Sequence, residues 1–77
     1  MPLRVVDGGG MVGSMGRVTG TVGPGLVGEV LIAVRGGTEA FLAYPAVPGD
    51  RITPGSLVVV QEYQPPRTVY VAALLPG

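Results

Sequence analysis

The hydrophobic pattern of this chain consists of short runs of valine, leucine and isoleucine, interrupted every few residues by glycine or proline. No run continues long enough to form a helix before a helix-breaking residue follows. Strand-length segments bounded by turn residues, recurring about every ten residues, are typical of a small all-β barrel or sandwich. The pattern therefore predicts an all-β fold.

Turn signals divide the chain into five expected strands. Gly23-Pro24-Gly25 separates the first strand from the second. The Gly36-Gly37 pair can adopt the positive φ angles of a type I′ turn, which predicts a hairpin in which Arg35 pairs with Thr38. Residues 64–67 form the last turn. The expected strands cover residues 11–22, 26–35, 39–44, 57–63 and 68–74.

The segment between the third and fourth strands is expected to be a long connection without a helix. Pro45, Pro48 and Pro54 prevent regular backbone hydrogen bonding there, and Ile52 is its expected buried anchor. Gly16 and Gly20 lie inside the first strand, where glycine marks a bend or bulge. These features predict a small five-stranded OB-like closed barrel that lacks the usual helix between strands three and four.

The fourth strand contains Val58, Val59 and Val60 in succession. Three apolar residues in a row break the alternation of a strand that has one solvated face. We therefore expect burial on both faces, one in the barrel core and the other against a partner protein or a neighbouring subunit.

The domain is expected to span residues 11–77, after a flexible leader of residues 1–10 that ends in three glycines. The chain has no window long and apolar enough to cross a bilayer and no signal peptide, which predicts a soluble chain. It contains neither cysteine nor histidine, so a disulfide, a thiolate metal site and an imidazole ligand are all excluded.

The sequence offers little material for catalysis. The serines Ser14 and Ser56 have no histidine to act as their base. The glycine-rich segment 8–13 lacks the lysine of a phosphate-binding loop, and no helix pattern follows it. The carboxylates are expected to be solvated, with Glu29 too far from the hairpin turn to face Glu39. We predict a non-enzymatic protein without cofactor or metal.

Binding of single-stranded nucleic acid is an alternative, because many OB-folds bind it. Five arginines balance five acidic residues and are spread evenly along the chain. The second and third strands offer only Arg35, Phe41 and Tyr44, opposed by Glu29 and Glu39. Without a basic stripe and several stacking aromatics, nucleic acid is an unfavoured partner.

Two groups of motifs in this order and spacing resemble the soluble C-terminal OB-fold domain of NfeD-like proteins. The first group comprises Gly16-Arg17-Val18, Val22-Gly23-Pro24-Gly25 and the continuous run from Gly28 to Phe41. The second comprises Ile52, Gly55, Val58-Val59-Val60, Glu62-Tyr63, Pro65-Pro66-Arg67-Thr68-Val69 and Val71. The similarity covers residues 11–75.

The resemblance implies a membrane context. NfeD-like proteins typically carry membrane-spanning helices beside this domain, and some add a serine-protease domain; neither occurs in this sequence. Their proposed partners are stomatin-, prohibitin- and flotillin-like membrane scaffolds. By resemblance, we expect a scaffold module of a membrane-anchored bacterial protein, facing the cytoplasm and acting in membrane organisation or membrane-protein quality control.

The expected protein contacts lie around the last turn. Tyrosine and arginine are favoured at interfaces, which selects Tyr63, Pro65, Pro66, Arg67 and Tyr70. Alternatively, Tyr70 caps the barrel and the prolines only stiffen the hairpin. A third possibility for the whole chain is a barrel that binds copies of itself as a homo-oligomer.

Overall fold

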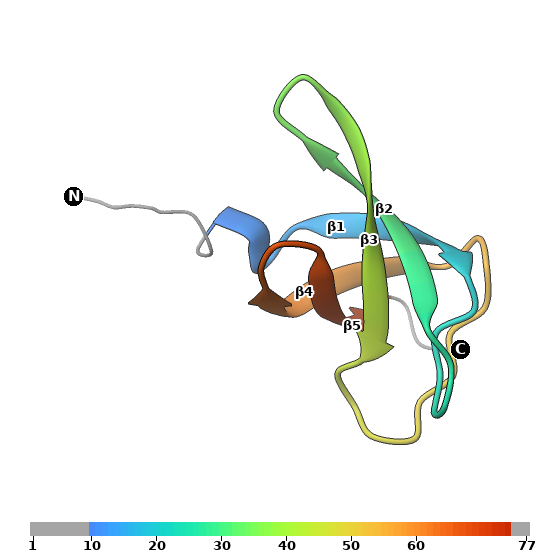
Figure 1. Ribbon diagram of the computed structural model, residues 1–77. Helices are drawn as coiled ribbons and strands as arrows, with labels where there is room; N and C mark the ends of the chain where they lie inside the picture. The colour runs from blue at the N-terminus through green and yellow to red at the C-terminus, as the bar shows by residue number, and fades with distance from the viewer. Residues whose placement is uncertain (1–9, 75–77) are drawn as a thin grey trace.

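The computed structural model describes residues 10–74 and contains a closed five-stranded barrel. Its strands follow one another around the barrel in the order β1-β2-β3-β5-β4 (Figure 1). Neighbouring strands are antiparallel except β3 and β5, which are parallel. The strands are β1 (Met15–Gly20), β2 (Gly28–Val34), β3 (Gly37–Pro45), β4 (Leu57–Gln64) and β5 (Thr68–Ala73). The predicted all-β OB-like barrel is confirmed.

The connection between β3 and β4, residues 46–56, contains turns and no helix, as expected. Ile52 anchors it: the side chain is buried, and its backbone forms an isolated bridge with Val22. The Ile52 amide donates to the Val22 carbonyl at 2.8 Å, and the Val22 amide donates back at 3.0 Å. The bridge ties the long connection to the chain segment that follows β1.

The first strand is shorter than predicted at both ends. Residues 10–13 form a tight turn instead of a strand, with the Ser14 amide donating to the Met11 carbonyl at 3.1 Å. At the other end the chain leaves the ladder after Gly20, and Val22 contributes only the isolated bridge. Most of the predicted leader, residues 1–9, lies outside the described residues.

The glycines of β1 occupy the bend that the sequence predicted. The β1–β2 register shifts between Val18 and Gly20, as a bulge requires. At Gly16 the neighbouring strand is so close that a Cβ atom would lie 2.9 Å from the carbonyl oxygen of Leu31. Glycine therefore permits both the bend and the close approach of the two strands.

The β2–β3 hairpin differs from the prediction by one residue. Val34 pairs with Gly37, so the two turn residues are Arg35 and Gly36, and Gly36 has a φ of 82°. The expected pairing of Arg35 with Thr38 is therefore wrong, and β3 begins earlier than expected, at Gly37. The hairpin extends beyond the body of the barrel (Figure 1).

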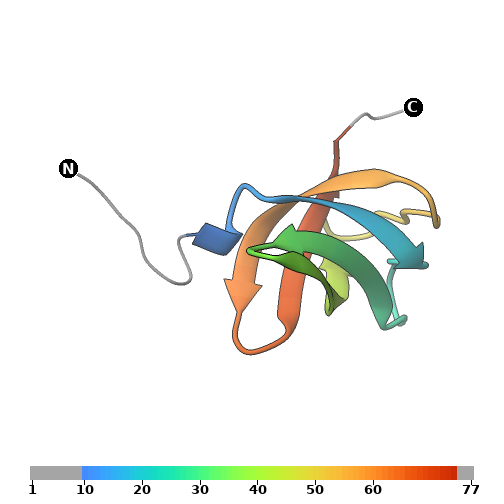
Figure 2. The same ribbon diagram turned by 90° about the horizontal axis from the view of Figure 1, so that it is seen from above.

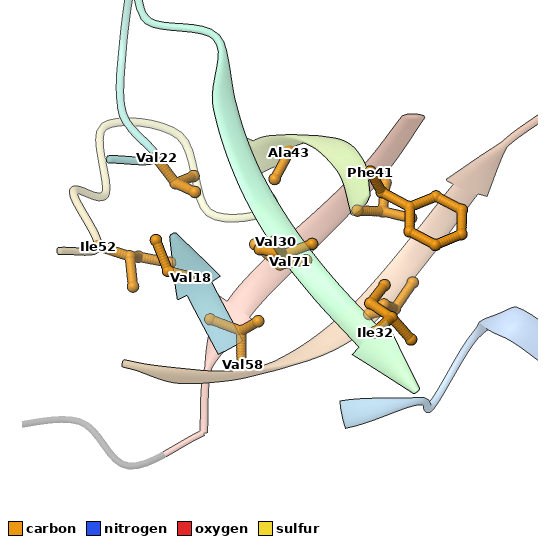
Figure 3. Packing of buried hydrophobic residues seen from close by; sticks show 11 residues of the cluster. Val18, Val22, Val30, Ile32, Phe41, Ala43, Ile52, Val58 and Val71 are labelled. Carbon is orange, nitrogen blue, oxygen red and sulfur yellow. The ribbon is translucent and has the colours of Figure 1, made fainter. Parts of the chain in front are cut away.

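The core consists almost entirely of β-branched side chains from alternate strand positions (Figure 3). Such residues pack well on a pleated surface, which explains why so small a barrel is rich in valine. Phe41 is the one aromatic ring among them. The buried residues are Val18, Val22, Val30, Ile32, Phe41, Ala43, Ile52, Val58, Val60, Val69 and Val71.

Candidate functional site

The five contact residues predicted from the sequence lie on or beside the β4–β5 hairpin, but their side chains point in different directions. Tyr63 is half-buried and packs against the core. Tyr70 lies between the buried residues Val69 and Val71, so strand alternation directs it to the outside of the barrel. Pro65 is exposed in the turn. The five residues therefore do not form one continuous surface.

Tyr63 is held by contacts within the molecule. Its hydroxyl donates to the Pro66 carbonyl across the turn, at 3.1 Å. Its ring meets the Phe41 ring edge-on, with centroids 6.4 Å apart and planes at 79°. These contacts fix the hairpin turn against one end of the core.

Arg67 connects the same hairpin to β3. Its Nη1 lies 3.0 Å from the Glu39 Oε1 and donates to the Ala40 carbonyl at 3.3 Å. Its guanidinium also lies 5.7 Å from the centroid of the Phe41 ring. Both charged side chains are about half exposed, so the ion pair contributes little to stability by itself. Together the contacts orient the hairpin that displays Pro65 and Pro66.

Tyr70 borders a hollow on the outer surface. Its ring packs on that of Tyr44, with centroids 5.7 Å apart and planes at 35°. The hollow has a volume of about 440 Å³. Its other lining residues are Ala46, Val47, Gln61, Glu62 and Ala72.

A second surface feature is an apolar area across β4, β1 and β2, here called the outer apolar face: Met15, Leu31, Ala33, Leu57 and Val59. In the ladder, Arg17 of β1 pairs with Leu31 on one side and with Leu57 on the other. Figure 2 shows β1 (blue) beside β4 (orange) along this wall of the barrel.

Three of these apolar side chains are exposed. Met15 has 59% of its surface accessible, Leu57 has 39% and Leu31 has 37%. They line a hollow of about 360 Å³ together with Arg17, whose Nη1 donates to the Gly55 carbonyl at 3.1 Å. On the outside of the barrel, then, large apolar side chains surround a single cation.

The sequence revealed only part of this face. The valine run of β4 predicted burial on both sides, and the structure places Val58 and Val60 in the core with Val59 half-buried outside. The contribution of β2 was missed. Its signal was the same: Leu31 and Ala33 alternate with the buried residues Val30 and Ile32, so both faces of that strand are apolar.

The acidic residues lie apart and have separate contacts. Glu29 lies opposite Leu42 and Glu39 opposite Ile32, so the two carboxylates do not face each other, as predicted. The Thr19 hydroxyl donates to the Glu29 carboxylate at 2.6 Å. Within residues 10–74, no group of three potential metal-ligating side chains occurs.

The aromatic residues considered for nucleic-acid stacking are buried or pack against other side chains of the chain. Phe41 is only 4% exposed, and Tyr44 packs on Tyr70. Arg35 lies at the tip of the β2–β3 hairpin. A nucleic acid stacking on this surface would need exposed ring faces, which the buried Phe41 does not offer.

The part of the chain that the structure describes contains no helix with the length and hydropathy needed to cross a membrane. Residues 15–72 match the family model of the NfeD C-terminal domain. No curated protein sequence matches the chain significantly.

Two solved structures share the fold. One is the soluble domain of a membrane protein implicated in regulation of membrane protease activity from Corynebacterium glutamicum. It is 25% identical over 84% of this chain and 94% of its own, with a TM-score of 0.69. The other is the C-terminal domain of stomatin operon partner protein 1510-C from Pyrococcus horikoshii. It is 26% identical over 94% of this chain and 100% of its own, with a TM-score of 0.66.

Proposed function

The chain belongs to the family of NfeD C-terminal domains, and we propose that it is a non-catalytic protein-interaction module acting with a stomatin- or flotillin-type membrane scaffold. Its role would be membrane organisation or membrane-protein quality control. The related structures are described as a stomatin operon partner protein and as a protein implicated in regulating membrane protease activity. Both descriptions support a role beside membrane-bound machinery.

The outer apolar face is the observation that carries the proposal. Met15, Leu31 and Leu57 expose large apolar side chains on rigid, neighbouring strands. Burying such side chains against a partner contributes about 25 cal/mol per Å² of apolar surface removed from water. Contiguous exposed apolar areas on a small domain are typical of interaction sites.

Arg17 indicates which kind of partner fits this face. A two-fold dimer uses the same surface on both copies, so it would bring two Arg17 side chains into one apolar interface. A different protein can instead supply a carboxylate opposite Arg17 while covering Leu31 and Leu57. We therefore favour a hetero-partner over a second copy of this chain.

We propose that the residues selected from the sequence add to the contact with a partner in two separate ways. Tyr70 faces outward and is available to a partner directly. Tyr63 and Arg67 hold the turn in place through Phe41 and β3, so that Pro65 and Pro66 are displayed at the surface. We further propose that the parent protein is anchored in a bacterial membrane with this domain in the cytoplasm.

The proposal is tested by direct binding. The chain is immobilised, and a purified stomatin-type protein from the same cell is passed over it in detergent. We expect saturable binding with a dissociation constant in the micromolar range, as is common for small transient interfaces. The absence of saturable binding to stomatin- and flotillin-type proteins alike would contradict the proposed function.

A further inference from the structure

The hollow beside Tyr70 is built by an irregularity in β4. Val60 pairs with Val71 and Glu62 pairs with Tyr70, so Gln61 is an extra residue without a counterpart on β5. Gln61 and Glu62 are consecutive, yet both are exposed. A β-bulge redirects side chains in this way, and bulges are frequent beside functional sites. This bulge directs an amide and a carboxylate outward, toward one hollow.

The hollow combines an aromatic wall with an apolar floor. Tyr70 is half-buried and held by the Tyr44 ring at 5.7 Å, so its orientation is fixed before anything binds. Ala46 lies beside it, with its amide donating to the Val71 carbonyl at 2.8 Å. The volume of about 440 Å³ is in the range of sites that take a small ligand or a side chain.

Glu62 gives the hollow a negative charge. Among the described residues, its side chain accepts one hydrogen bond, from the Gln64 amide at 3.4 Å. Within residues 10–74, the one salt bridge is that of Arg67 with Glu39. Glu62 and Tyr70 occupy paired positions on β4 and β5, where Cβ atoms lie about 5 Å apart, and both residues line the hollow.

We propose that this hollow binds an arginine side chain supplied by the partner protein. A planar guanidinium can stack on the Tyr70 ring and donate hydrogen bonds to the Glu62 carboxylate at the same time. An anionic group would be repelled by Glu62. A purely apolar group would leave Gln61 and Glu62 desolvated without hydrogen bonds, which is unfavourable.

Two other hollows on the barrel are lined, in the part of the chain that the structure describes, by an arginine and by no acidic residue. The one on the outer apolar face is lined by Arg17, and the one beside Met11 is lined by Arg35. Both would repel a guanidinium. The site beside Tyr70 thus deepens the proposed interaction function, on which it rests, because it names a side chain that the partner must provide.

The site can be tested without the partner. The amide spectrum of the chain is followed by NMR during titration with Nα-acetyl-arginine-N-methylamide. A parallel titration uses the citrulline analogue, which has nearly the same shape and no charge. We expect saturable shifts for Gln61, Glu62, Tyr70 and Ala72 with the arginine probe, and shifts at least about threefold smaller with citrulline.

Two matched variants test whether the charge of Glu62 is the one that binds the arginine probe. Glu62→Gln preserves the shape of the side chain and should weaken arginine binding by about threefold or more, since it removes the ionic contact. Glu29→Gln is the control: it makes the same chemical change at an exposed site on β2, where the amide oxygen can still accept the Thr19 hydroxyl. It should leave the titration unchanged.

Equal shifts with arginine and citrulline, or unchanged binding in Glu62→Gln, would overturn the inference. These results are distinguishable from a failure of the proposed function. If the chain binds a stomatin-type protein but not the arginine probe, only this inference fails. If the chain binds the probe at Tyr70 and Glu62 but binds no scaffold protein, the inferred arginine site is confirmed and the proposed partner is wrong.

Discussion

At Gly16 the barrel wall has no space for a side chain. The Cβ of any other residue there would lie 2.9 Å from the Leu31 carbonyl oxygen and 3.0 Å from the Ile32 Cγ1. The first of these atoms belongs to the backbone of β2 and cannot move without disturbing the β1–β2 ladder. Gly16 therefore controls how closely β1 and β2, two of the strands that carry the outer apolar face, approach each other.

Gly16→Ala is expected to destabilise the fold by about 2 kcal/mol, the usual penalty for forcing an extra group into a packed site. Urea unfolding followed by circular dichroism measures the difference. Gly37→Ala is the control, because nothing lies within 4 Å of the corresponding Cβ position. It should change the free energy of unfolding by less than about 0.5 kcal/mol. Equal effects of the two substitutions would show that crowding at Gly16 is unimportant.

At the scale of elements, β4 shows what the sequence could predict and what it could not. The strand itself was predicted at residues 57–63 and is found at Leu57–Gln64. Strict alternation from Val58 and Val60 would place Glu62 inside and Tyr63 outside. The bulge at Gln61 reverses this, with Glu62 exposed and Tyr63 packed on the core.

The reason for this difference is physical. An extra residue in one strand is stabilised by pairing with the neighbouring strand, and nothing in the local residue pattern marks it. In β1, by contrast, burial can be predicted from the sequence, because the buried Val18 lies between the exposed polar residues Arg17 and Thr19. The candidate site was only partly predictable for the same reason: Tyr70 could be selected by residue type, but its position beside Glu62 depends on the bulge.

The long connection, residues 46–56, depends on one side chain for its placement. Ile52→Ala should destabilise the protein by about 3 kcal/mol, because it leaves a cavity where the connection meets Val22. Val47→Ala is the matched control in the same connection, where Val47 is 50% exposed. It should cost less than about 0.5 kcal/mol. Comparable losses in urea unfolding would contradict the role of Ile52 as the anchor.

At the scale of the whole molecule, the outer apolar face and the charge of Arg17 together determine association. We expect the isolated chain to be monomeric in sedimentation velocity, even at concentrations of several hundred micromolar, because self-pairing of the face would bury two arginines without an acidic partner. A concentration-dependent dimer that disappears in Leu57→Glu would instead favour the homo-oligomer alternative.

The most direct test of the account compares two substitutions in the binding assay with the stomatin-type protein. Leu31→Glu places a charge on the outer apolar face, at the position paired with Arg17, whereas Val27→Glu makes a similar change outside that face, at a residue that is 65% exposed. We expect at least tenfold weaker binding for Leu31→Glu, about 1.4 kcal/mol, and binding close to that of the original chain for Val27→Glu. If both folded variants bind as tightly as the original chain, the outer apolar face is not the interaction surface.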